Sequence, residues 1–295
     1  MRNVVTPRVI EILAEVEESV EVVTQAKTMP KGVYADPAKV HKINHVGKHY
    51  EVAGPHLSEP SPQRTPLLFQ AGSSARGRQF AAKHTECVFI VESLESLKGP
   101  TNVITDVRNQ AARLGRNPED VLFFQGVSPV VGGTEAEAKA KEAEYLDQFS
   151  TEGSLAHLSG SVGVDLGAIN LDEPLHNIDS QGMRGFVKSL IESTPDKTQT
   201  FRDLIRTRIA GQFLTGAPEQ IADALQRWHG LGVDGFNLVY SITPGTFVDF
   251  IDSVVPILQS RELMQREYAP GPLRQKIFGD AKLSGRHPAA VYRRG

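Results

Sequence analysis

Short apolar runs alternate with amphipathic stretches along most of this chain. Runs typical of buried strands occur at Leu67–Phe69, Cys87–Val91, Val121–Phe124 and Gly235–Tyr240. Apolar residues at helical spacing follow these runs, and this alternation predicts β-α units in a parallel sheet covered by helices. Four units suit a doubly wound sheet, because a complete eight-unit barrel typically takes ~250 residues.

Local signals predict where the helices begin and end. Thr134 and Glu137 have the spacing of a capping box, Pro218 fits a first helical turn, and Gly115 fits a C-cap. The predicted helices include Phe80–Ala82, 103–114, 134–145, 201–208, 218–228 and a single helix over 247–258.

The β-α pattern occupies only part of the chain, and four regions can be distinguished. Loop signals interrupt the β-α rhythm at 151–200, which is too long for a simple connection and is typical of an insertion that shapes a site. The predicted regions are an atypical N-terminal helix at 1–30, a hairpin and loop region at 31–66, the sheet domain at 67–268 and a tail at 269–295 without helical or strand periodicity, expected on the outside.

His41, His45 and His49 are spaced so that a helix would align three imidazoles, which would suggest a metal. Gly47 and the alternation at 48–52 favour a hairpin instead, where that alignment disappears. We therefore predict no metal site.

Composition narrows the functional classes. The formal net charge of −3 gives no electrostatic reason to expect a nucleic-acid partner. Cys87 is the single cysteine and begins an apolar run, so we expect a buried structural thiol in a reducing compartment. No apolar stretch approaches the ~18–20 residues of a membrane span and no signal-peptide h-region is found, so we expect a cytoplasmic protein without a membrane partner.

The turn between the first two predicted strands is the best candidate for ligand binding. Gly72 permits close approach of the backbone, Ser73 or Ser74 can cap the following helix, and Arg76 is nearby in the sequence. A helix N-terminus of this kind attracts anions, usually a phosphate, although plain capping explains the same residues. Polar residues that can face a ligand at strand ends are Gln70, Ser128 and Asn237.

Several motifs in the expected order resemble one family, the luciferase-like FMN-dependent monooxygenases that include nitrilotriacetate monooxygenase component A and dibenzothiophene-sulfone monooxygenase. The resemblance covers about residues 31–280. The motifs are Gly32-Val-Tyr-Ala-Asp-Pro37, Ser61-Pro-Gln-Arg-Thr-Pro66, Gln70-Ala-Gly-Ser-Ser74, Gly77-Arg-Gln-Phe-Ala-Ala82, Gly216-Ala-Pro-Glu-Gln-Ile-Ala-Asp223, Gly235-Phe-Asn237 and Val255-Pro-Ile-Leu-Gln259.

The resemblance implies an α/β fold that is the second half of a luciferase-type (β/α)8 TIM barrel, with an inserted hairpin and a helical insertion, and without the N-terminal half. It also implies reduced FMN from a separate flavin reductase, O2, a small-molecule substrate and a homo-oligomer. Ser73 and Ser74 then contact the FMN phosphate and Gly72 gives backbone access. No catalytic residue is assigned.

Two alternatives remain at this point. One is a truncated, catalytically inactive half-barrel with a structural role or none. The other is a phosphate site in an isomerase- or aldolase-type barrel, which is disfavoured because no Schiff-base Lys or Glu/His pair lies at a predicted strand end.

Overall fold

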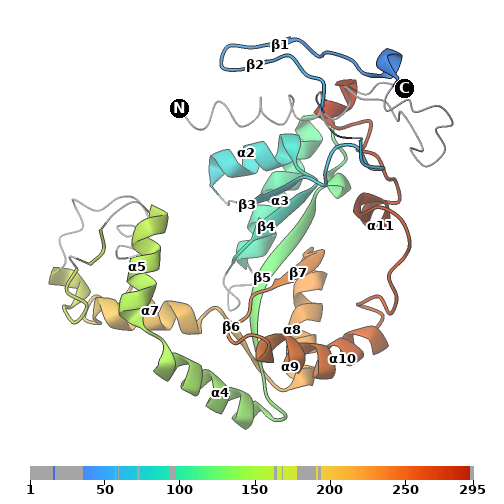
Figure 1. Cartoon of the computed structure of the whole chain (residues 1–295). Helices are drawn as coiled ribbons and strands as arrows, with labels where there is room; N and C mark the ends of the chain where they lie inside the picture. The colour runs from blue at the N-terminus through green and yellow to red at the C-terminus, as the bar shows by residue number, and fades with distance from the viewer. Residues whose placement is uncertain are drawn as a thin grey trace.

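The computed structural model describes residues 16, 36–56, 58, 60–71, 74–92, 98–162, 165–167, 169–177, 191 and 194–292. A parallel sheet forms the centre of this part of the chain (Figure 1). Its strands are β3 (Phe69–Ala71), β4 (Cys87–Ile90), β5 (Leu122–Val131), β6 (Phe213–Gly216) and β7 (Gly235–Leu238).

The long strand β5 organises the sheet because three strands pair with it. Phe124 pairs with Phe89 of β4 and with Gly235 of β7, so these two strands flank the first half of β5. The second half, from Ser128 to Val131, pairs with β6. The sequence predicted four strands and missed β6, whose four residues lack an apolar alternation and extend against the end of β5.

Strand order shows that the doubly wound expectation was wrong. The strands β3, β4, β5 and β7 are neighbours in the order in which they occur along the chain, without the reversal that defines a doubly wound sheet. Within the described residues the sheet is open: β3 pairs only with β4, and β6 and β7 each pair only with β5. The half-barrel organisation stays a prediction.

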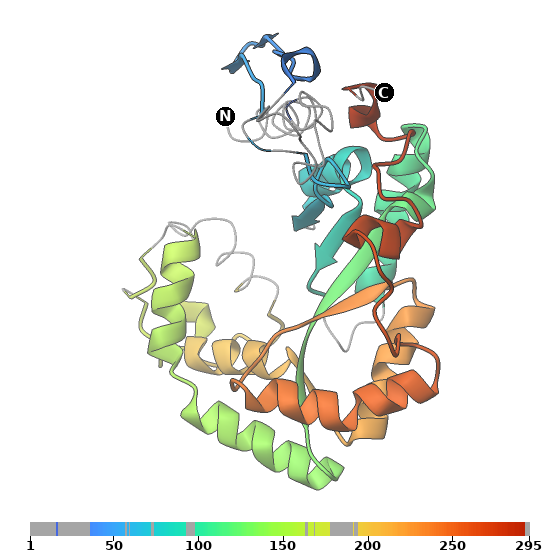
Figure 2. The ribbon, with the colours of Figure 1, turned by 45° about the vertical axis from the view of Figure 1, so that its right-hand side comes forward.

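The helices cover one face of this sheet, while an inserted helical segment stands on the other side (Figure 2). The chain also contains four short 3-10 helices in its described part, which are η2 (Pro37–Lys39), η3 (Pro118–Asp120), η4 (Leu175–Asn177) and η5 (Pro288–Tyr292). The α-helices are α2 (Ala75–His84), α3 (Lys98–Arg113), α4 (Glu135–Gln148), α5 (Thr151–Val162), α7 (Phe201–Ala210), α8 (Pro218–Gly230), α9 (Gly245–Ser253), α10 (Val255–Ser260) and α11 (Leu273–Phe278).

The main core lies between the sheet and its helices. Val88 and Phe123 from the sheet pack with Val107 of α3 and Trp228 of α8, and all four side chains are at most 3% exposed. Phe123, Gln125 and Val127 of β5 are buried, and the residues that alternate with them from Leu122 to Ser128 are half-buried on the opposite face. Burial on the helix side therefore leaves the other face available for a site.

Local capping predictions were confirmed. Thr134 and Glu137 form both hydrogen bonds of the capping box, Pro218 lies in the first turn of α8, and Gly115 has φ +78 after α3. The single helix predicted over 247–258 was wrong, because α9 ends at Ser253 and α10 begins at Val255. Pro256 lies in the first turn of α10, where its missing N–H does not interrupt a helix.

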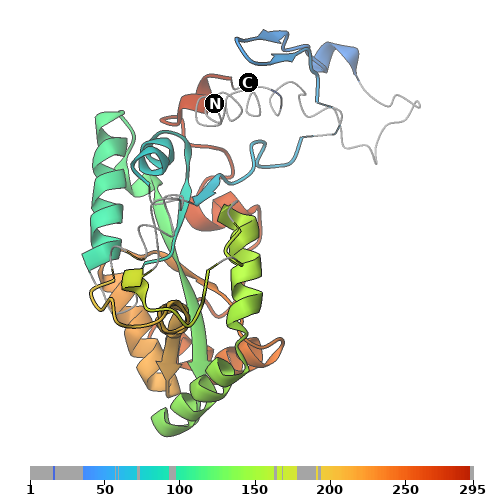
Figure 3. The ribbon, with the colours of Figure 1, turned by 90° about the vertical axis from the view of Figure 1, so that its left-hand side faces the viewer.

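The regions around the sheet also have defined structure. β1 (His45–Val46) and β2 (Glu51–Val52) form the predicted antiparallel hairpin, so the three histidines do not align on a helix (Figure 3). The insertion contains α5, whose Leu155 packs with Phe201 and Ile205 of α7 in a small core of its own.

The structure bears differently on the expectations for the two ends of the chain. The tail contains α11 and η5, two short helical elements that its sequence shows no periodicity for. The helix predicted at 1–30 lies outside the described residues except for residue 16. Among the helices described, none has the length and apolar character needed to cross a membrane.

Candidate functional site

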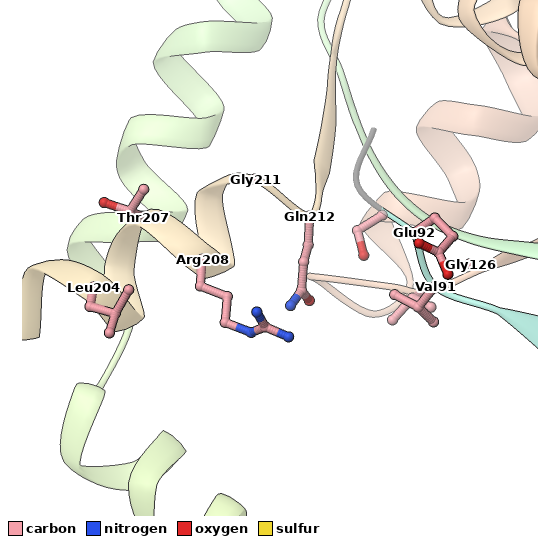
Figure 4. Close-up of a pocket in the computed structure, with 10 residues that line it drawn as sticks. Val91, Glu92, Gly126, Leu204, Thr207, Arg208, Gly211 and Gln212 are labelled. Carbon is pink, nitrogen blue, oxygen red and sulfur yellow. The ribbon is translucent and has the colours of Figure 1, made fainter. Parts of the chain in front are cut away.

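A pocket of about 410 Å³ lies on the open face of the sheet, between β5 and helix α7 (Figure 4). Its floor comes from β5 and from the residues that follow β4 and β7, and its wall comes from α7 and the turn after it. The lining residues are Val91, Glu92, Gly126, Ser128, Leu204, Thr207, Arg208, Gly211, Gln212 and Val239.

The position of this pocket favours it over other cavities. Val91 follows the carboxyl end of β4 and Val239 follows that of β7, and ligands of parallel α/β sheets bind at the carboxyl ends of strands. A cavity of about 320 Å³ lies instead near Glu86 and Asp120, before the amino ends of β4 and β5. Another, of about 270 Å³, lies between α8 and α10 beside β7.

Polar side chains enter the pocket from two sides. Arg208 and Gln212 project into it from α7 and the following turn, and Glu92 lies on the opposite side next to Val91 (Figure 4). This arrangement places hydrogen-bond donors at one end and a carboxyl group at the other.

Gln125 fixes the loop that carries Glu92. The Gln125 side chain is fully buried, and its Oε1 accepts from the Glu92 N–H at 3.2 Å while its Nε2 donates to the Glu92 carbonyl at 3.2 Å. Burial raises the pKa of Glu92, and the nearby Arg78 opposes that effect. Glu92 is therefore a positioned carboxyl group whose charged form is disfavoured.

The predicted anion site lies at the start of α2, on the same carboxyl-end side of the sheet. Ser74 is the N-cap, and its hydroxyl accepts from the Gly77 N–H at 3.1 Å. No acidic residue occurs in the first turn of this helix, which carries Arg76. Gly72 and Ser73, the other two predicted residues, lie outside the described residues.

These observations fit a phosphate at the start of α2. The first N–H groups of a helix have no intrahelical acceptor, the helix dipole favours negative charge there, and no carboxylate in the first turn competes. Arg78 connects this end of α2 with the pocket, because its charge acts on Glu92 while its guanidinium pairs with Asp106 at 3.1 Å.

Of the three polar strand-end residues singled out in the sequence, only one lines the pocket. Ser128 lines the pocket, whereas Gln70 bonds the Ala71 carbonyl at 2.8 Å and Asn237 is exposed on β7. Cys87 is fully buried, which confirms the predicted buried thiol, and burial raises its pKa to about 12.

Sequence reasoning missed the pocket residues on which the site depends. Glu92 had a usable signal, since it closely follows an apolar run. Arg208 and Gln212 had none, because they lie in α7 and in the turn after it, whose position over the sheet is set by tertiary packing.

Comparison with known proteins gives one family. The profile of the luciferase-like monooxygenase family matches residues 11–235. The chain is 44% identical over 268 residues to dimethyl-sulfide monooxygenase from Hyphomicrobium sulfonivorans, which covers 89% of this chain and 55% of that protein. It is 31% identical over 276 residues to nitrilotriacetate monooxygenase component A from Aminobacter aminovorans, an alignment that covers 91% of this chain and 60% of that protein.

Solved structures agree with this similarity. The crystal structure of DmoA from Hyphomicrobium sulfonivorans superimposes with a TM-score of 0.85 and 40% sequence identity, and the match covers 99% of this chain and 63% of the DmoA chain. A riboflavin lyase structure containing modified FMN superimposes with a TM-score of 0.82 and 30% sequence identity, and the match covers 100% of this chain and 66% of the riboflavin lyase chain. The chain thus spans between 55% and 60% of the length of those two curated relatives.

Proposed function

Because the chain belongs to the luciferase-like monooxygenase family, we propose that it acts as a flavin-dependent monooxygenase that uses reduced FMN and O2 to oxidise a small organic substrate. Bound FMN supplies the oxygen chemistry in this proposal. The chain's own residues bind the flavin phosphate, orient the substrate and line the pocket.

The observation that carries this proposal is the start of α2 beside the carboxyl-end pocket. Ser74 caps a helix without acidic residues in its first turn, in the motif that the resemblance assigns to the FMN phosphate. Gly72 and Ser73 complete that motif in the sequence. Among the relatives, a riboflavin lyase structure contains modified FMN, which supports a flavin as the cofactor.

The proposed partners follow from the same family. A separate flavin reductase supplies the reduced FMN. We also propose a homo-oligomer, supported by the exposed apolar side chains of Phe69 and Tyr240, which are 50% and 59% exposed near the sheet edges. The single buried thiol is compatible with a cytoplasmic location.

Anaerobic titration with reduced FMN tests the cofactor proposal. We expect saturable binding that Ser73→Ala/Ser74→Ala weakens by about 1–3 kcal/mol, the usual loss when a charged group forfeits hydrogen bonds. Thr134→Ala is a matched control, because it removes the N-cap of α4 and leaves the site intact. Equal binding by the double variant would reject the phosphate site.

A second candidate is a half-barrel without catalytic activity of its own. The open edges of the sheet within the described residues favour it. A folded chain that binds neither reduced nor oxidised FMN would support this candidate. Substrate-dependent product formation, with a flavin reductase supplying reduced FMN, would exclude it.

A further inference from the structure

We propose that the pocket between β5 and α7 binds an organic substrate with an apolar body and an anionic oxygen head group, and that Arg208 and Gln212 contact this head group. The inference deepens the proposed function and rests on it, because it names the substrate class of the same site. Its evidence is the distribution of polar and apolar groups around the pocket.

The size and apolar lining of the pocket suit a small organic molecule. A volume of about 410 Å³ lies in the range of ligand pockets, ~300–1,000 Å³. Val91 and Val239 are 61% and 46% exposed, and both side chains line the pocket together with Leu204. Large apolar side chains at a strand end, with this much surface uncovered, favour contact with an apolar part of a ligand.

The polar end of the pocket is rich in hydrogen-bond donors. Arg208 lies in the last turn of α7, and Gln212 follows the end of that helix. The Gly211 N–H donates to the Thr207 carbonyl at 2.9 Å and the Gln212 N–H to the Ile209 carbonyl at 3.0 Å, so the turn that carries Gln212 is fixed.

The side chains at this end select for negative charge. A guanidinium is always charged and presents several donors in a planar fork, which matches the oxygens of a carboxylate or sulfonate. The amide of Gln212 adds N–H donors beside it (Figure 4).

Glu92 sets the orientation of the ligand. It lies across the pocket from Arg208 (Figure 4), and Arg78 of α2 is close enough to act on its pKa. The Glu92 carboxyl group gives an anionic head group no favourable charge interaction in either protonation state, whereas the Arg208 guanidinium at the α7 end attracts it. The apolar body then extends toward Glu92 and the start of α2, where the flavin phosphate is proposed.

Binding of four matched probes to the flavin-free chain tests the inference. Hexanoate, hexane-1-sulfonate, hexan-1-ol and hexan-1-amine share one apolar body and differ in the head group. By isothermal titration calorimetry, we expect at least one acid to bind about tenfold or more tightly than the alcohol, and the amine to bind most weakly. The two acids distinguish carboxylate from sulfonate recognition.

Variants identify the residues responsible. Arg208→Gln should weaken the binding of the acids by about tenfold or more and leave the alcohol within about twofold. Gln212→Leu tests the same head-group site independently, with a smaller loss. Arg206→Gln is the matched control, since it removes an arginine from the same helix outside the pocket lining.

Several outcomes would overturn the inference. They are equal affinity for acid and alcohol, tighter binding of the amine, equal effects of Arg206→Gln and Arg208→Gln, or no probe binding by a chain shown to be folded. Because these probes are titrated without flavin, a failure here is distinguishable from loss of reduced-FMN binding in the Ser73→Ala/Ser74→Ala variant.

Discussion

Arg274 of α11 forms a buried bidentate ion pair with Glu86, the residue before β4. Its Nε lies 2.7 Å from Oε1 and its Nη2 lies 2.9 Å from Oε2, and the two side chains are 1% and 6% exposed. The guanidinium also donates to the carbonyls of Gln63 and Pro66. One side chain therefore joins the tail to the amino end of the sheet and to the segment that precedes it.

Arg274→Met should lower the free energy of unfolding by about 3–5 kcal/mol, because it leaves the Glu86 carboxylate buried without its partner. Urea unfolding monitored by circular dichroism measures this change. The double variant Arg274→Met/Glu86→Leu should regain part of the loss. Arg286→Ala removes an arginine that is 55% exposed and pairs with Asp120, so it should cost only about 0–1 kcal/mol. Equal losses for the two arginines would contradict the prediction.

Gln125→Leu should loosen the loop that carries Glu92. The substitution removes both hydrogen bonds to the Glu92 backbone and leaves polar groups unsatisfied, at a cost of about 1–3 kcal/mol. Hydrogen exchange at the Glu92 amide should become faster, while amides in α8 keep their protection relative to global unfolding. Unchanged exchange at Glu92 would show that Gln125 does not hold this loop.

Stability should fall at acidic pH because of two histidines. Burial is the main cause that lowers the pKa of His84 and of His287 from 6.5 to about 4. Lys83 and Arg116 add to the effect on His84, while the bond between His287 Nε2 and the His84 carbonyl opposes it for His287. The folded state thus binds fewer protons than the unfolded state. Stability is fully present above about pH 6.5 and is lost as the pH falls toward 4.

The variant His84→Phe should reduce this acid sensitivity. Within the described part of the chain, the buried ring nitrogens of His84 have no hydrogen-bond partner, and the ring packs against Phe80. A phenyl ring keeps that packing and cannot be protonated. Urea unfolding between pH 7 and pH 4 should show a smaller loss of stability than in the unmodified chain, whereas the exposed control His176→Gln should not. An unchanged pH dependence in His84→Phe would refute the assignment.

Gly132→Ala should destabilise the junction between β5 and α4. A Cβ at this position would lie 2.3 Å from the backbone nitrogen of Ala138, which cannot move without displacing the helix. We expect a loss of about 1–3 kcal/mol by thermal or urea unfolding. Gly160→Ala in α5 meets nothing within 4 Å and should gain about 0.5–1 kcal/mol. A neutral result at Gly132 would contradict the predicted clash.

Local chemistry was predictable from the sequence because its determinants lie within one turn of the chain. The capping box of Thr134 and Glu137, the C-cap at Gly115 and the cap at Ser74 each depend on residues at most four positions apart. The same reasoning failed at Pro256, where the apolar pattern continues through a helix boundary.

The sequence by itself determined the β-α alternation, the apolar face of each helix and the family motifs, since periodicity and capping are local properties. The tertiary structure decided which distant groups meet. Strand β6 forms because β5 extends past β4 and β7, Arg274 reaches Glu86 across 188 positions, and α7 brings Arg208 to the pocket opposite Glu92. These relationships depend on how the elements pack in space, and no local pattern of residues specifies them.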